Sequence, residues 1–536
     1  MLNNTIFSRR PLIFPKLFSL GEFRLNSVPL TKKQLLIFVI VLVASVIVKL
    51  LIIDYNMIDH GEGATRTWNA FWWAQNPFFV KPLSGNPGWF YLIGPLIMIT
   101  NEIYYTPIIV MIFAVTLAGI YIFKITLLFA GFRTSMLAFF IFLINPVIFR
   151  LNFTPIPQQL YLASICIMIF YFIKAIAADE SRQSIKYFLI AGVFSFICLL
   201  FRAEGLFILL GFCMIALNLR KPGSYLFVFL TILFQIIWMG ISYQMYGDFF
   251  KTFTAVRDYD FLVGGNIEGL NLKVRLMGFF MPAYFIVVGM TFVLFYFLVK
   301  GAIITYKTRS FLIFLILLFP IFLPAFINGL YGTISNLYLT TRYFYLTFYL
   351  ASIITAFGLD SFLVRFNSKA VKYSLASVII LSAIPLSYIK DFVPVKYNKL
   401  VPKVIQFIAT SEDSQDARQL MKFIEENILS YPSLIFDTEG SDSSILTIPF
   451  RTKLAPPEKI MISGYNIPVE KQALTAEILS FMGKNKKGII FVKKEPTLMN
   501  SIFTELMAQN KNPGVSMTKA GETNKWVIFL FEPTQK

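Results

Sequence analysis

Residues Leu35–Ile53, LLIFVIVLVASVIVKLLII, form an apolar run of the length that a membrane-spanning helix needs. At about 1.5 Å per residue, a helix of this length crosses most of the ~30 Å hydrocarbon core of a bilayer. A long basic stretch precedes the run and no small-residue cleavage site follows it, so we do not interpret it as a removed signal peptide. The sequence therefore predicts a first transmembrane helix whose N-terminus is cytoplasmic.

The composition of the whole chain excludes an ordinary soluble protein. Of 536 residues, 57% are hydrophobic and only 14% are charged, whereas a soluble domain carries about 25% charged residues. The net charge of +19 is unevenly placed, with 29 basic and 13 acidic residues up to Ser387 but 19 and 16 from Lys390 onward. This asymmetry favours basic cytoplasmic loops followed by a soluble domain, and it does not suggest nucleic-acid binding.

Ten further apolar runs indicate membrane spans. They are Pro107–Ala130, Ser135–Phe149, Leu160–Ala177, Tyr187–Phe201, Leu206–Leu219, Tyr225–Tyr243, Leu276–Val299, Phe311–Phe326, Tyr343–Phe362 and Tyr373–Tyr388. We therefore predict an α-helical polytopic membrane protein with about eleven transmembrane helices in residues 1–389. A small α/β domain is predicted for residues 390–536. In that domain, the hydrophobic pattern predicts helices at Asp413–Ile428 and Leu474–Met482, and strands at Ser433–Asp437, Gly488–Lys493 and Trp526–Phe531.

The short run Gly88–Thr100, GWFYLIGPLIMIT, decides the orientation of every later loop. As a helix it reaches about 20 Å, which is too short for the hydrocarbon core. Trp89 and Tyr91 are typical of a membrane interface. A helix lying on the membrane here leaves the short basic loops around Arg133, Lys221 and Lys307 inside, as the positive-inside rule requires.

The first outer loop, residues 54–106, carries the most informative polar pattern. It contains Asp59-His60-Gly61-Glu62 and, four residues after Glu62, Arg66, so that this acid and this base could lie one helical turn apart. The alternative interpretation is a solvated loop with an interfacial aromatic belt. One histidine, and three cysteines in apolar runs (Cys166, Cys198 and Cys213), indicate neither a zinc site nor a disulfide framework.

The order of several short motifs resembles that of the GT-C superfamily of membrane glycosyltransferases, which includes protein mannosyltransferases and lipid A aminoarabinose transferases. The resemblance extends over about the first 390 residues. The motifs are Glu62-Gly-Ala-Thr-Arg66, the Pro-aromatic stretch Pro87–Tyr91, Asn145-Pro146, Phe201-Arg202-Ala-Glu-Gly205, Tyr246-Gly-Asp248 and Thr341-Arg342-Tyr343-Phe-Tyr-Leu346.

The resemblance implies an enzyme of the plasma (inner) membrane that moves a hexose or pentose from a polyprenyl-phosphate carrier to an acceptor hydroxyl on the outer face, with inversion. The acceptor is a glycan, a lipid or a protein, and membrane lipids surround the enzyme. Glu62 is then the general base, with Asp59 as the alternative. The residues implied for the donor phosphate are Arg66, Arg342, Arg202, Lys81 and Arg257, and those for positioning the acceptor or the loop are His60, Trp68, Asp248 and Tyr343.

The sequence departs from the family in two places. Family members often have a second acid where Pro155-Ile156-Pro157-Gln158-Gln159 stands, and here glutamines replace it. The usual adjacent Asp-Glu pair is also missing, because His60 and Gly61 separate Asp59 from Glu62. The first departure weakens a metal-dependent version of the reaction, so we assign no metal ligand and no cofactor, although a divalent metal is compatible with the family. The second leaves the base open between Asp59 and Glu62, and we favour Glu62.

Two other functions are compatible with a polytopic, basic-inside chain. A lipid or solute transporter frequently has internal repeats and ionisable residues in mid-span; we find no repeat and few charges at the centres of the spans. A non-catalytic subunit for assembly of envelope polysaccharide would use the outer α/β domain to bind a partner, and it would not depend on Glu62.

We predict that residues 390–536 lie outside the cytoplasm, because an odd number of spans beginning inside must end outside. In a variant without the three native cysteines, a cysteine introduced at an exposed position of this domain should react with a membrane-impermeant maleimide on intact cells. Labelling only after lysis would contradict both the number of spans and the outer position of the first loop.

Overall fold

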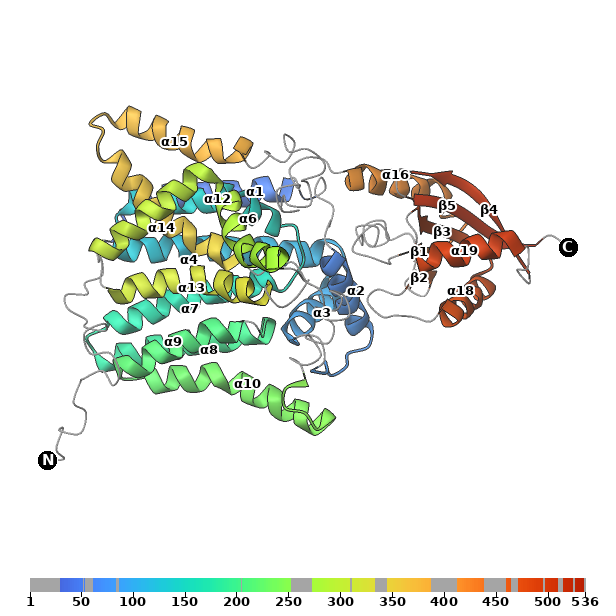
Figure 1. Ribbon diagram of the computed structural model, residues 1–536, viewed down its shortest axis with the longest axis horizontal. Helices are drawn as coiled ribbons and strands as arrows, with labels where there is room; N and C mark the ends of the chain where they lie inside the picture. The colour runs from blue at the N-terminus through green and yellow to red at the C-terminus, as the bar shows by residue number, and fades with distance from the viewer. Residues whose placement is uncertain are drawn as a thin grey trace.

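The computed structural model of the chain contains a bundle of long helices and a smaller part with a β-sheet (Figure 1). It describes residues 29–51, 53, 61–82, 86–203, 205–251, 272–308, 311–332, 345–386, 412–437, 459–463, 471–494, 497–509, 514–523 and 526–534.

Twelve of the described helices form the bundle, and two more, α2 (Gly61–Gln75) and α3 (Gly88–Thr100), lie at one end of it (Figure 1). The helices of the bundle are α1 (Lys32–Leu51), α4 (Tyr105–Phe129), α5 (Phe132–Ile144), α6 (Pro146–Leu151), α7 (Gln158–Ala177), α8 (Ser181–Phe201), α9 (Gly205–Leu219), α10 (Ser224–Tyr246), α12 (Leu272–Thr308), α13 (Phe311–Gly332), α14 (Tyr345–Leu363) and α15 (Lys369–Leu386).

Seven described segments are long and apolar enough to cross a membrane: α1, α4, α7, α8, α10, α14 and residues Gly289–Lys307 of α12. Shorter apolar helices lie at Gly88–Thr100, Phe132–Ile144, Gly205–Leu219 and Leu312–Leu323. Each of the eleven predicted runs overlaps a helix of the bundle. The predicted class, a helical polytopic membrane protein with a small α/β part, is therefore confirmed, while the number of spans stays a prediction.

Two predicted spans differ in detail from the helices that form. The run Ser135–Phe149 is broken at Asn145, whose Oδ1 accepts the backbone N–H groups of Val147 and Ile148 at 3.0 and 3.2 Å and so begins α6. Pro146 has no N–H to continue α5. The run Leu276–Val299 becomes a longer helix, α12, which is kinked at the buried residue Thr291, where φ is 62°.

An ion pair joins α5 to α14 at the end of the bundle that the sequence predicts to be cytoplasmic. Arg133 Nε donates to Asp360 Oδ1 at 2.8 Å, and Thr134 Oγ1 donates to Asp360 Oδ2 at 3.0 Å. Both charged side chains are partly exposed, so a modest stabilisation is expected. The pair explains why an acid occurs among the basic residues of this end.

Two glycines let α12 and α14 approach closely. A Cβ atom at Gly301 would lie 1.8 Å from the carbonyl oxygen of Ile354, and one at Gly358 would lie 2.0 Å from that of Phe297. Small residues at such crossings let two helix backbones come into close van der Waals contact. In a membrane this packing drives helix association, because no hydrophobic effect acts between the helices. The contact fixes α14 at the centre of the bundle, where 83% of its most apolar 18-residue stretch is buried.

The C-terminal part is a five-stranded sheet with the order β2-β1-β3-β5-β4. Its strands are β1 (Leu434–Asp437), β2 (Ile460–Ser463), β3 (Gly488–Lys493), β4 (Val515–Glu522) and β5 (Trp526–Pro533). β2, β1 and β3 are parallel, while β5 and β4 are antiparallel. The three predicted strands correspond to β1, β3 and β5, whereas β2 and β4 were not predicted.

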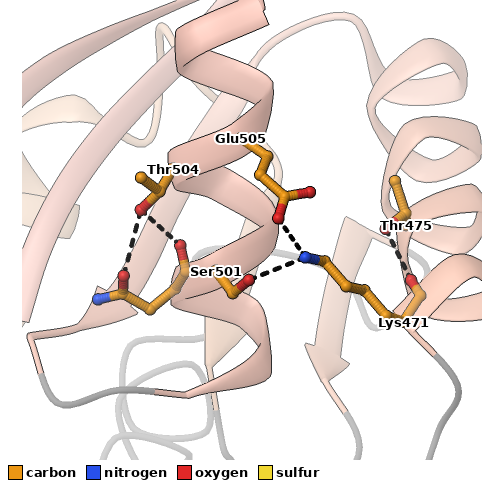
Figure 2. A network of polar contacts seen from close by, with 6 residues as sticks. Lys471, Thr475, Ser501, Thr504 and Glu505 are labelled. Atoms are coloured by element: carbon orange, nitrogen blue, oxygen red, sulfur yellow. Dashed lines mark hydrogen bonds and ion pairs between the residues drawn. The ribbon is translucent and has the colours of Figure 1, made fainter.

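Helices cover both faces of this sheet. α16 (Glu412–Asn427) packs Leu420 and Ile424 against one face. α18 (Lys471–Asn485) and α19 (Leu498–Gln509) pack on the other through Ile478 and Phe503. Figure 2 shows how these two helices are joined: the ammonium of Lys471 on α18 contacts Ser501 Oγ at 3.0 Å and the Glu505 carboxylate on α19. α16 and α18 confirm the two predicted helices, and α19 is an additional one.

We predict that Gly358→Ala destabilises the bundle, because the added methyl group would collide with the backbone of α12. Overpacking of this kind costs about 1–3 kcal/mol. The melting temperature of the purified protein in detergent should fall by several degrees. Gly240→Ala on α10 is the matched control, because its Cβ would meet nothing within 4 Å. Equal melting temperatures for the two variants would contradict the close contact.

Candidate functional site

The first outer loop contains a helix, α2, on which Glu62 and Arg66 lie four residues apart. Positions separated by four residues share one face of a helix. The predicted spacing of one helical turn between this acid and this base is therefore realised in the backbone. Trp68, on the next turn, packs between two apolar clusters that include Tyr104 before α4 and Trp89 on α3.

α3 holds α2 in place. The indole Nε1 of the fully buried Trp89 donates to the backbone oxygen of Arg66 at 3.0 Å. A Cβ atom at Gly94 would lie 2.2 Å from the ring of Trp73, so this glycine lets the two helices pack at short distance. α3 has the bounds predicted for the surface-lying segment, and it lies at the end of the bundle beside α2 (Figure 1).

The start of α3 is fixed to the end of α8. Asn86 Nδ2 donates to the carbonyl oxygen of Leu199. A Cβ atom at Gly88 would lie 2.7 Å from the carbonyl oxygen of Leu200. Arg202 follows directly, in extended backbone that ends α8. Residues 86–89 therefore contact the backbone of Arg66 and the end of α8 just before Arg202. Both arginines are predicted phosphate-binding residues.

The glutamines that replace the family's second acid lie at the start of α7. Gln159 is buried, and its Nε2 donates to the carbonyl oxygens of Leu151 and Thr154 at 2.8 and 2.7 Å. Gln158 is 4% exposed, and neither its Nε2 nor its Oε1 has a hydrogen-bond partner in the described chain. The thiol of Cys198 on α8 contacts the carbonyl oxygen of Tyr161 at 3.8 Å, which places this first turn beside the end of α8.

Several buried polar groups at this end of the bundle have no partner within the described residues. They are Lys49 Nζ, Thr67 Oγ1, Asn86 Oδ1, Asn152 Oδ1, Gln159 Oε1 and both polar atoms of Gln158. An unpaired buried polar group costs free energy unless water or a ligand satisfies it. Similar atoms occur elsewhere in the bundle, so their presence alone does not define a site. Here, however, they lie on the segments that contact α2 and α3.

The remaining predicted residues are placed as follows. Lys81 is exposed and Asp248 is partly buried, and Asp248 Oδ1 accepts the backbone N–H of Phe250 at 2.8 Å, which gives it a local role in the turn after α10. Of Glu62 the structure describes the backbone. Asp59, His60, Arg257, Arg342 and Tyr343 lie outside the described residues, and Arg342 precedes the first residue of α14 by three positions. The structure therefore places the backbone segments of Arg66 and Arg202 against the 86–89 stretch, and all the functional assignments stay predictions.

Sequence reasoning missed Lys49 on α1 and Asn86. Lys49 is 3% exposed. The signal in the sequence was a single lysine within an otherwise uncharged span. Among the described cysteines and acids, no group of three could hold a metal ion.

No protein-family model and no curated protein sequence matches the chain. Its structure, in contrast, is similar to that of ArnT from Cupriavidus metallidurans bound to undecaprenyl phosphate, with a TM-score of 0.62 over 94% of this chain and 98% of that one, at 10% identity. The chain has the GT-C fold. The same protein in the apo state matches with a TM-score of 0.55 and 12% identity, over 92% of this chain and 97% of that one. The oligosaccharyltransferase of Archaeoglobus fulgidus matches with a TM-score of 0.49 and 14% identity, over 85% of this chain and 69% of that one.

The GT-C resemblance inferred from short motifs is therefore confirmed for the fold. The match extends over nearly the whole of both chains, so it includes the C-terminal α/β part as well as the bundle. At 10% identity it does not assign the side chains.

Proposed function

We propose that the protein is an integral membrane glycosyltransferase that uses a polyprenyl-phosphate-linked sugar as donor. One observation carries this proposal: α2, with Glu62 and Arg66 one turn apart, is held by α3 at the end of a bundle whose fold is that of a transferase solved with undecaprenyl phosphate. The reaction transfers a hexosyl or pentosyl group to an acceptor hydroxyl on the outer face, with inversion at the anomeric carbon.

In this reaction Glu62 is the general base. The acceptor hydroxyl loses its proton to the carboxylate as its oxygen bonds to the anomeric carbon, and the bond from that carbon to the carrier phosphate breaks. Such assistance typically contributes about 10²–10⁴-fold to the rate. Asp59, three residues earlier, positions the loop or the acceptor, and it is the alternative base.

The leaving phosphate requires fixed positive charge. Arginine suits this task because its planar fork donates two parallel hydrogen bonds to phosphate oxygens. Arg66 and Arg202 lie on segments joined by the 86–89 stretch, as described above. We assign the carrier phosphate to these two residues and to Arg342, with Arg257 and Lys81 at the edge of the site.

The buried amides at the start of α7 support a sugar as the transferred group. Gln158 has one unpaired donor and one unpaired acceptor, and Gln159 has one unpaired acceptor within the described chain. A hydroxyl group both donates and accepts, so neighbouring hydroxyls of a sugar match this set. Carboxamides give the site less negative charge than the second acid of other family members would.

The assembly-subunit alternative has one favourable feature, the α/β part with its layered core, but it predicts no requirement for Glu62. The transporter alternative gains no support from the bundle, where the polar groups described above lie at one end and α14 fills the centre.

We predict that Glu62→Gln lowers the turnover of sugar transfer by about 10²–10⁴-fold, because the amide keeps the size of the side chain but accepts no proton. Carrier binding should change little. The measurement is a transfer assay with purified protein and a polyprenyl-phosphate sugar chosen by comparing envelope glycans and glycolipids with and without the gene.

Two variants accompany Glu62→Gln in this assay. Glu102→Gln, in the loop between α3 and α4, is the matched control and should keep normal turnover. Asp59→Asn should have a smaller effect than Glu62→Gln. An inactive Asp59→Asn beside a normal Glu62→Gln would assign the base to Asp59, and normal activity of both would contradict the glycosyltransferase proposal.

We also predict that Arg342→Lys weakens carrier binding while the protein still folds, because lysine keeps the charge but loses the two parallel hydrogen bonds. Binding of undecaprenyl phosphate by purified variants is the readout. Arg365→Ala, beyond the other end of α14, is the matched control and should bind normally. Unchanged binding in Arg342→Ala would assign Arg342 to the interface of the membrane instead.

A further inference from the structure

Lys49 is a buried cation in a membrane span. It is one of two buried residues among the lysines and arginines that the structure describes; the other, Lys493, lies in the α/β part with its Nζ 5.7 Å from the centre of the Trp526 ring. The Nζ of Lys49 has no hydrogen-bond or ion-pair partner in the described chain. An ionisable side chain is expensive inside a membrane, and those that occur there usually serve a ligand or a partner charge.

The surroundings of Lys49 exclude the ordinary role of a lysine at a helix end. Lys49 lies two residues before the end of α1, close enough for a long side chain to reach the water beyond the span. A lysine of this kind is exposed at its tip, as Lys124 on α4 illustrates by its exposed side chain over the Tyr121 ring. The tip of Lys49 is instead enclosed by protein, although most of α1 is not buried within the bundle.

The face of α1 that carries Lys49 is turned toward the candidate site. Val46 lies three residues before Lys49, which places the two on one face of α1, and Ile53 lies two residues beyond the end of the helix. Both pack in a cluster with Ile108 of α4, Phe153 and Trp68 of α2. Trp68 lies two residues after Arg66. Lys49 therefore lies on the face of α1 that packs against the same apolar cluster as Trp68 of α2, the helix that carries Arg66.

A second unpaired group lies at the same cluster. Asn152 directly precedes Phe153, is 1% exposed, and donates from Nδ2 to the carbonyl oxygens of Ile148 and Phe149 at 3.1 and 2.8 Å. Its Oδ1 has no partner in the described residues, yet Lys49 does not donate to it. The amide therefore does not satisfy the ammonium, which has no counter-charge among the residues that the structure describes.

We propose that Lys49 binds the phosphate group of the polyprenyl-phosphate carrier from within the membrane, beneath α2. The inference rests on the proposed function and adds to it a cation on the first span, where a lipid-linked phosphate enters at the depth of the headgroups. The ammonium is a compact point charge, which suits a phosphate that must bind before transfer and leave afterwards, whereas the arginines hold it by geometry.

The test uses the full-length protein in detergent, with undecaprenyl phosphate as the probe and undecaprenol as the uncharged comparison. Removing one partner of a buried charge pair weakens binding strongly, so Lys49→Met should lower the affinity for undecaprenyl phosphate by about 30-fold or more. Lys49→Arg should keep most of the affinity. Binding of undecaprenol should be the same in all variants. Lys124→Met is the matched control and should bind the carrier normally.

The stability of the free protein provides an independent readout. If Lys49 awaits an anionic ligand, Lys49→Met removes an uncompensated buried charge, and the ligand-free variant should melt at or above the temperature of the natural protein. If Lys49 pairs with a carboxylate of its own chain, Lys49→Met should melt lower and bind the carrier normally, which would overturn the inference. Where Lys49→Met does not fold, Lys49→Gln supplies the same comparison.

The outcomes separate this inference from the proposed function. Carrier binding that does not depend on Lys49 overturns the inference and leaves the glycosyltransferase proposal intact. If the natural protein shows no preference for undecaprenyl phosphate over undecaprenol, phosphate recognition is absent, and both fail. Loss of carrier affinity in Lys49→Met with normal binding by Lys124→Met supports both.

Discussion

No water is available in the middle of a bilayer, so each backbone N–H and C=O group of a spanning segment must bond within the protein. This constraint makes the spans helical, and it also determines what their hydroxyl groups do. Thr126 and Thr305 donate to carbonyl oxygens one turn earlier in their own helices, at 2.8 Å in each case. Buried polar side chains without such local partners, such as Lys49 and Gln158, are therefore the ones that point to a ligand.

The constraint also explains why the candidate site lies at an end of the bundle. Non-helical backbone and charged side chains are tolerated where the spans stop, and there α2 and α3 cover the ends of α4, α7 and α8. The contacts of Trp89 with the Arg66 backbone and of Asn86 with Leu199 join segments that are far apart in sequence. Because Gly88 and Gly94 lack side chains, these contacts form at short distance, so the position of α2 depends on the packing of α3.

Much of the fold could be predicted because the patterns are strong and local. The 19-residue run beginning at Leu35, the short Gly88–Thr100 run and the buried strand Gly488–Lys493 all form the predicted elements. β4 was missed because it is a partly polar strand at the edge of the sheet, and α19 because its 12 residues give a weak periodic signal. The break at Asn145 depends on a side-chain cap, which an apolar run does not reveal.

For the site, the spacing in the sequence predicted that Glu62 and Arg66 lie one helical turn apart. Lys49 was not predicted, because its burial depends on tertiary packing.

The charges at this end of the bundle connect ligand binding with stability. The proposed site combines Lys49, Arg66, Arg202 and Arg342 with the carboxylate of Glu62, and glutamines stand where the family often has a second acid. Such a site has excess positive charge when it is empty, and a phosphate that carries negative charge offsets it. A ligand that binds only the folded protein stabilises it by mass action. An anionic carrier should therefore stabilise this protein more than a neutral lipid of the same length, and the excess should depend on the cations that the phosphate contacts.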